Sequence, residues 1–326
     1  MKKIVSFILN DKDFSIREYK KGDEQILLPL MNKNFDEKWT LEDWNWKYNE
    51  NPVGFSGLIL LNKKESIVGQ FGHLFKKWKV YDKEYKALMG VDVFVDKNYQ
   101  GYGLTGKMFR YLHNFYPKKD FFHYGFPNDT ALKAYSKSGD FYKNYNISKT
   151  YYLYKKYNLF SKLQFNFKNS KHSLNISRLS EDNKQEVDNL WNKKKKELEV
   201  CVVRDFEYLN RRILQSPEKM ELFLIKHNNE TVGYFSIMIR DKVCYITDIL
   251  ILNDFTNKNI INEIERFCLK FSPKEIRIFV TDKLISNILK NFKFNLFDIG
   301  LFTYYNNIEK SVKILPYLTF SDFDSV

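Results

Sequence analysis

The sequence is poor in residues that interrupt regular structure and in residues that form covalent or metal cross-links. It contains 13 Gly, 7 Pro and 3 Cys among 326 residues. So little Gly and Pro excludes a collagen-like or low-complexity chain. The cysteines, Cys201, Cys244 and Cys268, lack the close spacing of a zinc knuckle or a redox pair, so we expect neither a metal site nor a disulfide framework.

Long hydrophobic runs are also missing. No stretch approaches the roughly 18 apolar residues of a membrane-spanning helix. The apolar start of the chain is interrupted at Asn10 and Asp11 before any small-residue cleavage site, so no export signal is expected. These absences predict a soluble protein of the reducing cytoplasm, without a membrane partner.

What the sequence does contain is apolar material and positive charge. Hydrophobic residues make up 44% and aromatic residues 17%, enough for cores in two domains of about 150 residues each. The net charge of +13 favours anionic ligands, such as phosphates, nucleic acid or an acidic membrane surface. Charge alone does not choose among these ligands.

Two stretches show the same order of turns and apolar runs, which predicts one fold used twice. The first extends from Ile67 to Phe141 and the second from Thr231 to Phe294. Aligning Asp248 with Asp92 matches Phe255 with Tyr99 and Ile260 with Leu104, and in the last segment Asp282 falls on Asp129 and Phe294 on Phe141. The apolar positions agree, whereas the glycines are present only in the first copy.

Runs of β-branched and aromatic residues alternate with helical patterns. The expected elements of the first copy are strands at Gly57–Leu61, Ile67–Trp78, Lys86–Val95, Phe121–Phe126 and Tyr151–Tyr154 and helices at Thr105–Phe115 and Asp129–Ser138. This order predicts an α/β (α+β) fold with a mixed sheet and helices on its faces. A polar, Lys-rich segment near residues 155–173 separates an expected domain 1–160 from an expected domain 170–326.

The most informative segment is the bend between the strand that ends near Val95 and the following helix. Its residues are Gln100, Gly101, Tyr102, Gly103, Leu104, Thr105 and Gly106. Closely spaced glycines at the start of a helix leave backbone N–H groups exposed where the helix dipole favours an anion. A few such hydrogen bonds, each worth roughly 1.5 to 3 kcal/mol, are enough to hold a pyrophosphate.

This bend resembles motif A of the GCN5-related N-acetyltransferase (GNAT) superfamily, R/Q-x-x-G-x-G/A, through Gln100, Gly103 and Thr105, with Thr in place of the last Gly or Ala. A second signature of that superfamily is matched by Asn128, Tyr135, Gly139 and Phe141. The resemblance implies two tandem GNAT folds that use acyl-CoA and no metal. The second fold is expected to be degenerate, because Asn257, Asn259 and Thr281 stand at the positions of Gly101, Gly103 and Asn128.

The resemblance also implies roles for individual residues. The backbone of Val93, Phe94 and Val95 would run beside the pantetheine arm, and residues Gln100 to Gly106 would hold the pyrophosphate. Tyr135 would protonate the departing thiolate, and Asn128 would order the gap between strands. A core aromatic of an amphipathic helix is the other interpretation of Tyr135.

A general base helps to remove the proton of an acceptor amine. If residues whose numbers sum to 165 face each other across a hairpin centred on Asp82 and Lys83, then His73 lies opposite Asp92. We expect this pair to be the base, although a shift of one residue in register would separate it. Surface or packing roles are expected for the other histidines, His113, His123, His172 and His227.

The acceptor is expected to bind at the aromatic segment Glu37–Gly57. Trp44, Trp46 and Tyr48 are the candidate contacts, with core packing as the alternative. The layout is similar to that of tandem GNAT proteins that acylate nucleotide-linked amino sugars, as in the anthrose pathway. A dTDP-linked amino sugar is therefore the expected acceptor. An aminoglycoside, a polyamine or a peptide amine is the alternative, and so is a non-catalytic module that binds an acidic partner.

Overall fold

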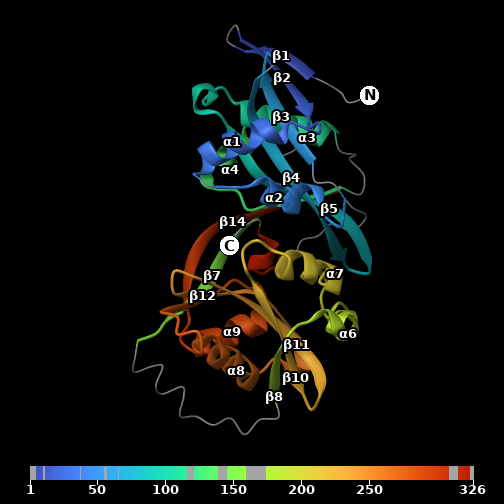
Figure 1. Ribbon diagram of the computed structural model, residues 1–326, viewed down its shortest axis with the longest axis vertical. Coiled ribbons are helices and arrows are strands. Elements are labelled where there is room, and N and C mark those ends of the chain that lie inside the picture. Colours follow the sequence, from blue (N-terminus) through green and yellow to red (C-terminus); the bar gives the residue numbers. More distant parts are fainter. Residues whose placement is uncertain are drawn as a thin grey trace. The chain divides into compact units, whose positions relative to one another are not determined.

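The computed structural model describes residues 5–9, 12–36, 38–54, 57–64, 66–115, 121–138, 145–158, 174–307 and 315–323. These residues form two compact units (Figure 1). Unit 1 consists of Met1–Lys77, Tyr85–Lys149 and Gly300–Lys313, and unit 2 of Trp78–Glu84, Thr150–Ile299 and Ile314–Val326. Each unit therefore takes in segments from the other half of the sequence, which a single cut between residues 160 and 170 does not describe.

The sheet of unit 1 has the order β1-β2-β3-β4-β5-β6-β14. Its β5–β6 pair is parallel, whereas β1–β2, β2–β3, β3–β4 and β6–β14 are antiparallel or hairpin neighbours. The elements up to its last helix are β1 (Val5–Leu9), β2 (Lys12–Glu18), α1 (Glu24–Phe35), α2 (Leu41–Trp44), the π-helical turn η1 (Asn45–Asn49), β3 (Gly57–Lys63), β4 (Ser66–Val80), β5 (Lys83–Val95), η2 (Lys97–Tyr99), α3 (Leu104–Phe115), β6 (Phe121–Gly125) and α4 (Asp129–Ser136).

The sheet of unit 2 has the order β7-β13-β12-β11-β10-β8, and only its β12–β13 pair is parallel. The elements of the chain from β7 onward are β7 (Asn146–Lys156), β8 (Leu174–Arg178), η4 (Glu181–Asn183), α6 (Lys184–Lys194), β9 (Val200–Val202), α7 (Phe206–Leu209), the π-helical turn η5 (Asn210–Leu214), β10 (Glu221–His227), β11 (Glu230–Arg240), β12 (Val243–Ile251), η6 (Asn253–Phe255), α8 (Lys258–Leu269), β13 (Glu275–Ile278), α9 (Lys283–Asn291), β14 (Asn295–Asn307) and η7 (Phe320–Asp322). In Figure 1, α8 and α9 lie on one side of strands β10–β12, and α6 and α7 lie on the other.

The predicted α/β fold with a mixed sheet is confirmed, and so are the predicted strands and helices of the first copy, to within a few residues at their ends. The same order of elements occurs in both halves of the chain. In each half a four-residue helix runs into a π-helical turn, followed by three strands, a short 3₁₀ turn, a helix, a strand, a helix and a last strand. This shared order agrees with the repeat that the apolar pattern predicts.

A glycine at the same point of each half illustrates why the two patterns agree. A Cβ at Gly69 would lie 2.8 Å from the carbonyl oxygen of Phe94, and a Cβ at Gly233 would lie 2.7 Å from that of Leu250. Real Cβ atoms do not approach backbone this closely, so only glycine fits at either position. Strands β4 and β5 of unit 1 therefore pack on each other in the same way as strands β11 and β12 of unit 2.

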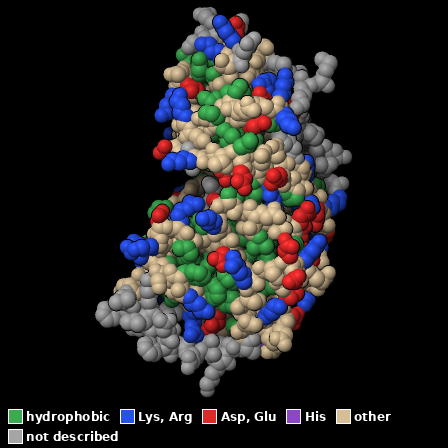
Figure 2. Space-filling view, in the orientation of Figure 1, with side chains coloured by type: hydrophobic (Ala, Val, Ile, Leu, Met, Phe, Trp, Pro, Cys, Tyr) green, Lys and Arg blue, Asp and Glu red, His purple; other side chains and the backbone are tan. Residues whose placement is uncertain are grey.

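Each unit has its own apolar core. In unit 1, α3 packs on the sheet through Met108, Phe109 and Leu112, all fully buried. None of the helices in the described residues is long and apolar enough to cross a membrane. On the face shown in Figure 2, Lys and Arg side chains are scattered among acidic and apolar ones instead of forming one continuous band.

Candidate functional site

The bend between β5 and α3 is open, as the sequence predicts. Gly101 and Gly103 have φ values of +85° and +69°, and a Cβ added to either would meet no atom within 4 Å. The side chain of Gln100 donates a hydrogen bond to the carbonyl of Val95 over 2.9 Å and so holds the bend against the end of β5. The first turn of α3 contains no acidic residue. The first-turn N–H groups of α3 have no partner within the helix, and no side chain projects from Gly101 or Gly103 to fill the space at this bend.

The other residues of the bend divide into two kinds. Leu104 is buried in the core of unit 1, and Tyr102 packs against that core. A Cβ at Gly106 would lie 3.3 Å from the carbonyl oxygen of Ala134 and from Cβ of Ser138, so Gly106 allows α3 to approach α4 closely. Thr105 is half-buried in the first turn of α3. Gly106 thus has a packing role, and its side chain position faces the protein.

Strands β5 and β6 pair only briefly and then separate. The pairs are Ala87 with Phe122, Leu88 with His123 and Met89 with Tyr124. Beyond this point β5 continues to Val95, whereas β6 ends at Gly125. We refer to the place where the two strands separate, next to Gly90 and Gly125, as the strand parting. The predicted pantetheine contacts Val93, Phe94 and Val95 all lie on the part of β5 beyond it.

Asp92 lies on this part of β5 in a left-handed conformation, with a φ of +46°. Its carboxylate forms an ion pair with the ammonium of Lys47 over 2.7 Å and accepts a hydrogen bond from the hydroxyl of Tyr48. The side chain of Gln70 donates to its backbone carbonyl over 3.0 Å. The carboxylate is therefore held by two side chains of η1, and Gln70 holds the backbone of the same residue.

Lys47 is the functional candidate that the sequence interpretation missed. Its side chain is only 2% exposed, and its ammonium lies 4.5 Å from the centre of the Trp39 ring. The residue comes from η1, where the π-helical turn places Lys47 and Tyr48 together. A lysine between aromatic residues in "NWKYN" was the available signal, because a lysine is buried only when it is paired.

The hairpin between β4 and β5 gives no support to the predicted pairing of His73 with Asp92. The turn falls at Tyr81 and Asp82, one residue earlier than expected, because β4 ends at Val80 and β5 begins at Lys83. In the matching hairpin of unit 2, Ser236 pairs with Asp248, and a bulge then shifts the register so that Ile237 pairs with Ile246. Because Gly69 and Gly233 pack alike on the neighbouring strand, we infer the same register in unit 1. The position of His73 then faces that of Gly90.

His73 instead lies over β3. It pairs with Gly57, and a Cβ on Gly57 would lie only 1.9 Å from its Nε2 atom. Burial lowers the pKa of the imidazole to about 3, with a smaller electrostatic contribution from Lys86. His73 is therefore neutral near pH 7 and contacts the sheet next to Gly57.

His113 and His123, for which surface or packing roles are expected, share a hydrogen-bond partner in the structure. The hydroxyl of Tyr145 lies 2.7 Å from Nε2 of His113 and 2.7 Å from Nδ1 of His123. Burial lowers the pKa of His113 to about 4, and it lowers that of His123 well below its usual value, with additional contributions from His113 and His73. His172 lies outside the described residues, and His227 packs on Phe255.

The remaining predicted residues lie in the core or at helix ends. Tyr135 is buried and stacks on Phe109 with ring centres 4.3 Å apart. The side chain of Asn128 accepts a hydrogen bond from the backbone N–H of Ala131 and so caps α4. Trp44 is fully buried against Tyr48, with ring centres 4.5 Å apart, whereas Trp46 is half-buried. Gly139 and Phe141 lie outside the described residues.

The cap of α4 also corrects the alignment of the two halves. Asp282 caps α9 by accepting a hydrogen bond from the N–H of Ile285, as Asn128 does in α4. The counterpart of Asn128 is therefore Asp282, and the predicted match of Thr281 with Asn128 is wrong by one residue. The error arose because the segment between the last strand and the helix differs in length between the two halves.

The corresponding bend of unit 2 is closed by its own side chain. Asn257 stands at the position of Gly101, and its side chain accepts hydrogen bonds from the N–H groups of Asn259 and Ile260 at the start of α8. These first-turn groups are the ones that an anion would need. The helix N-terminus of unit 2 is thus satisfied from within the chain.

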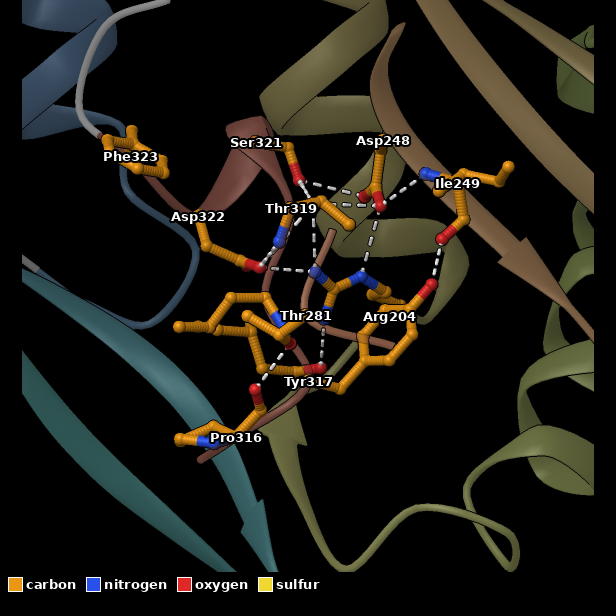
Figure 3. Close-up of polar contacts among 12 residues, drawn as sticks. Arg204, Asp248, Ile249, Thr281, Pro316, Tyr317, Thr319, Ser321, Asp322 and Phe323 are labelled. Carbon is orange, nitrogen blue, oxygen red and sulfur yellow. Dashed lines mark hydrogen bonds and ion pairs between the residues drawn. The ribbon is translucent and has the colours of Figure 1, made fainter. Parts of the chain in front are cut away.

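A C-terminal segment of unit 2, Tyr317–Asp322, lies beside the residues that follow β13. Thr319 pairs with Val280, and the N–H of Thr281 donates to the carbonyl of Leu318 over 3.1 Å. Figure 3 shows that Arg204 lies between Asp248 and Asp322, both of which accept hydrogen bonds from it. All three side chains are fully buried. Asp248 therefore serves an internal ion-pair network in unit 2.

Among the residues that the structure describes, no three His, Cys, Asp or Glu side chains gather closely enough to hold a metal ion. The open bend and the strand parting of unit 1 are the features that fit a ligand, and the ligand they fit is an extended anion.

No known sequence family matches this chain, and no curated protein matches its sequence. Solved structures do match its fold. A protein from Enterococcus faecalis V583, described as a probable N-acyltransferase, matches with a TM-score of 0.65 and 11% identity over 89% of this chain and 71% of that chain. A GCN5-related N-acetyltransferase from Anabaena variabilis matches with a TM-score of 0.60 and 13% identity over 89% and 72% of the two chains.

A structure of N-myristoyltransferase from Saccharomyces cerevisiae with bound myristoyl-CoA also matches, with a TM-score of 0.56 and 12% identity over 93% of this chain and 82% of that chain. At such low identity these likenesses establish the fold. The chain has the mixed α/β architecture of GNAT-type acyltransferases.

Proposed function

We propose that this chain is an acyl-CoA-dependent N-acyltransferase and that unit 1 carries the activity. One observation carries the proposal: the bend at Gly101 and Gly103 is open and lies at the N-terminus of a helix, after a strand that has parted from its neighbour. This arrangement fits a ligand with a diphosphate and a long arm. The fold shared with acyltransferases, one of them holding myristoyl-CoA, adds support.

In the proposed reaction an amine attacks the thioester carbonyl directly, and CoA leaves as the thiol. The residues Gln100 to Leu104 bind the pyrophosphate, and the backbone of Val93 to Val95 positions the pantetheine arm. Asp92 accepts a proton from the acceptor amine, and Lys47 and Tyr48 hold its carboxylate in place. Tyr135 donates a proton to the thiolate. A direct His73–Asp92 pair has no part in this mechanism.

The acceptor is a primary amine. The sequence favours a nucleotide-linked amino sugar, because a basic chain suits an acceptor with its own diphosphate. The structural relatives give no support to this acceptor over a peptide or a small polyamine. A panel of a dTDP-linked amino sugar, an aminoglycoside, a polyamine and peptides with a free N-terminus, assayed for acyl transfer, identifies the class.

Isothermal titration with acetyl-CoA and longer acyl-CoA molecules tests the central observation. Gly103→Ala is expected to weaken acyl-CoA binding at least 10-fold, because a side chain enters the bend and a positive φ opposes it. Gly22→Ala is the matched control, since Gly22 also has a positive φ and open space around it but lies in the turn before α1. Equal binding by both variants contradicts the proposal.

Asp92→Ala is expected to bind acyl-CoA but to lose turnover, which separates the roles of the bend and the carboxylate. Unchanged turnover removes Asp92 from the mechanism. If the chain binds DNA with a steep salt dependence and has no affinity for acyl-CoA, the alternative of a binding module is correct. The scattered positive charge on the face in Figure 2 does not favour that alternative.

A further inference from the structure

We infer that His123, Tyr145 and His113 form a proton relay that leads from the strand parting of unit 1 to the half-buried end of α3, an inference that rests on the proposed acyl transfer. The hydroxyl of Tyr145 lies 2.7 Å from a ring nitrogen of each histidine. A hydroxyl has one proton, so it donates to one imidazole and accepts an N–H from the other. The three side chains therefore form a continuous hydrogen-bonded chain.

The inner end of this relay lies at the place where the reaction is proposed to occur. His123 is on β6, where its partner on β5 is Leu88, and it is 3% exposed. A Cβ on Gly90 would lie 3.3 Å from its Nε2 atom, so this nitrogen faces β5 at the strand parting, two residues before Asp92. The outer end, His113, is in the last turn of α3 and is half-buried.

The corresponding positions of unit 2 supply a second, independent observation. With the alignment that places Asp248 on Asp92, His113 corresponds to Leu269, and the strand pairing places His123 on Ile276. Tyr145 directly precedes β7, and Phe294 directly precedes β14. The fold therefore accepts apolar residues at all three positions. The relay occurs in the unit whose bend is open and is replaced by apolar residues in the unit whose bend is closed by Asn257.

Acyl transfer releases one proton overall, because an ammonium and a thioester become an amide and a thiol. The N–C bond forms and the C–S bond breaks. One proton of the nitrogen goes to Asp92 and balances the proton that Tyr135 gives to the thiolate sulfur, and the second proton of the nitrogen must reach solvent. In the relay, Nε2 of His123 takes this proton while its Nδ1 proton moves to Tyr145. The hydroxyl proton of Tyr145 moves to Nε2 of His113, and His113 releases its Nδ1 proton to water.

Burial suits both imidazoles to this task. The depressed pKa values of His113 and His123 keep both rings neutral near pH 7, so each ring has one nitrogen that accepts and one that donates. A protonated ring would block the chain, because both of its nitrogens would donate. The neutral rings pass a proton without storing it.

Tyr145→Phe interrupts the relay and keeps the aromatic ring. We expect kcat to fall about 100-fold, the scale of a lost proton-transfer group, while the Kd for acetyl-CoA stays within about twofold of the wild type. Tyr157→Phe is the matched control in unit 2, because it also removes a buried hydroxyl hydrogen bond, to Glu265 over 2.5 Å. A kcat for Tyr145→Phe equal to that of the control, or a parallel loss of acetyl-CoA binding, overturns the relay.

His113→Gln is the second variant, because His113 is half-buried and a substitution there disturbs the core less. It must also lower kcat and leave acetyl-CoA binding unchanged. When kcat is measured in mixtures of H₂O and D₂O, its dependence on the D₂O fraction must indicate that more than one proton moves in the rate-limiting step of the wild type. The same measurement must indicate fewer moving protons in both variants. An unchanged proton inventory in the variants contradicts the relay.

A readout that needs no turnover distinguishes failure of the relay from failure of the proposed function. In ¹⁵N spectra of the resting wild type, His123 must be the Nδ1–H tautomer, with Nε2 of His113 unprotonated. The opposite tautomers overturn the relay even if acyl transfer occurs. If the chain binds no acyl-CoA, the proposed function is refuted. The role of the relay in acyl transfer is then refuted as well.

Discussion

Lys47 and Asp92 form an ion pair 2.7 Å long in the interior of unit 1, with side chains that are 2% and 12% exposed. Removing one partner of a buried pair leaves the other charge without compensation, at a cost of about 3 to 5 kcal/mol. Lys47→Met is therefore expected to lower the free energy of unfolding by that amount, as measured by urea unfolding followed by tryptophan fluorescence.

Lys193→Met is the matched control for this prediction. Lys193 pairs with Glu230 at the surface, where the two side chains are 56% and 54% exposed. Solvent-exposed pairs contribute about 0 to 1 kcal/mol. If both substitutions change the unfolding free energy equally, the Lys47–Asp92 pair has no special structural role.

One acyl-CoA is expected to bind per chain. The side chain of Asn257 occupies the first-turn N–H groups of α8 in unit 2, and the segment Tyr317–Asp322 lies beside the residues after β13. Titration calorimetry is therefore expected to give a stoichiometry of one. Asn257→Gly removes the cap but leaves the C-terminal segment, so it should still give one site. Two sites in the wild type contradict this assignment.

The stability of unit 1 is expected to depend on pH through its buried histidines. Burial lowers the pKa of His73 to about 3 and that of His113 to about 4, whereas an unfolded histidine titrates near 6.5. Between these values the unfolded state binds more protons than the native state, so stability rises with pH. It is lost as the pH falls below about 6.5, by about 1.4 kcal/mol for each histidine and pH unit.

Urea midpoints measured between pH 5 and 8 check this dependence, because most carboxylates titrate below that range. His113→Gln should reduce the slope of the unfolding free energy against pH, between pH 5 and 6.5, by about 1.4 kcal/mol per pH unit, the contribution of one histidine. A slope of the same size in the variant would show that His113 does not contribute to it.

Gly57 and His73 are expected to be energetically coupled. A Cβ at Gly57 would overlap Nε2 of His73 at 1.9 Å, and the ring is fully buried and has little room to move. Gly57→Ala should therefore be strongly destabilising, whereas the double variant Gly57→Ala/His73→Ala should lose clearly less than the sum of the two single changes. Additive losses in the unfolding free energies would show that the contact is not tight.

Local patterns in the sequence determined a large part of this structure. Apolar periodicity sets which segments of both halves become strands and helices, and it does so without reference to distant residues. The glycines at positions 101 and 103 predicted an open bend, because glycine adopts positive φ values without steric cost and adds no side chain to the bend. These features depend on neighbours in the chain, and so they can be read from it.

Only the tertiary structure decided which side chains meet. The β4–β5 turn falls one residue earlier than predicted, and His73 pairs with Gly57, whereas Lys47 and Tyr48 from a π-helical turn bind the carboxylate of Asp92. The contact of Tyr145 with His113 and His123 joins three separate elements, and no local pattern specifies it. Such contacts depend on register and on packing between distant segments, where a single residue of displacement turns a side chain to the other face of the sheet.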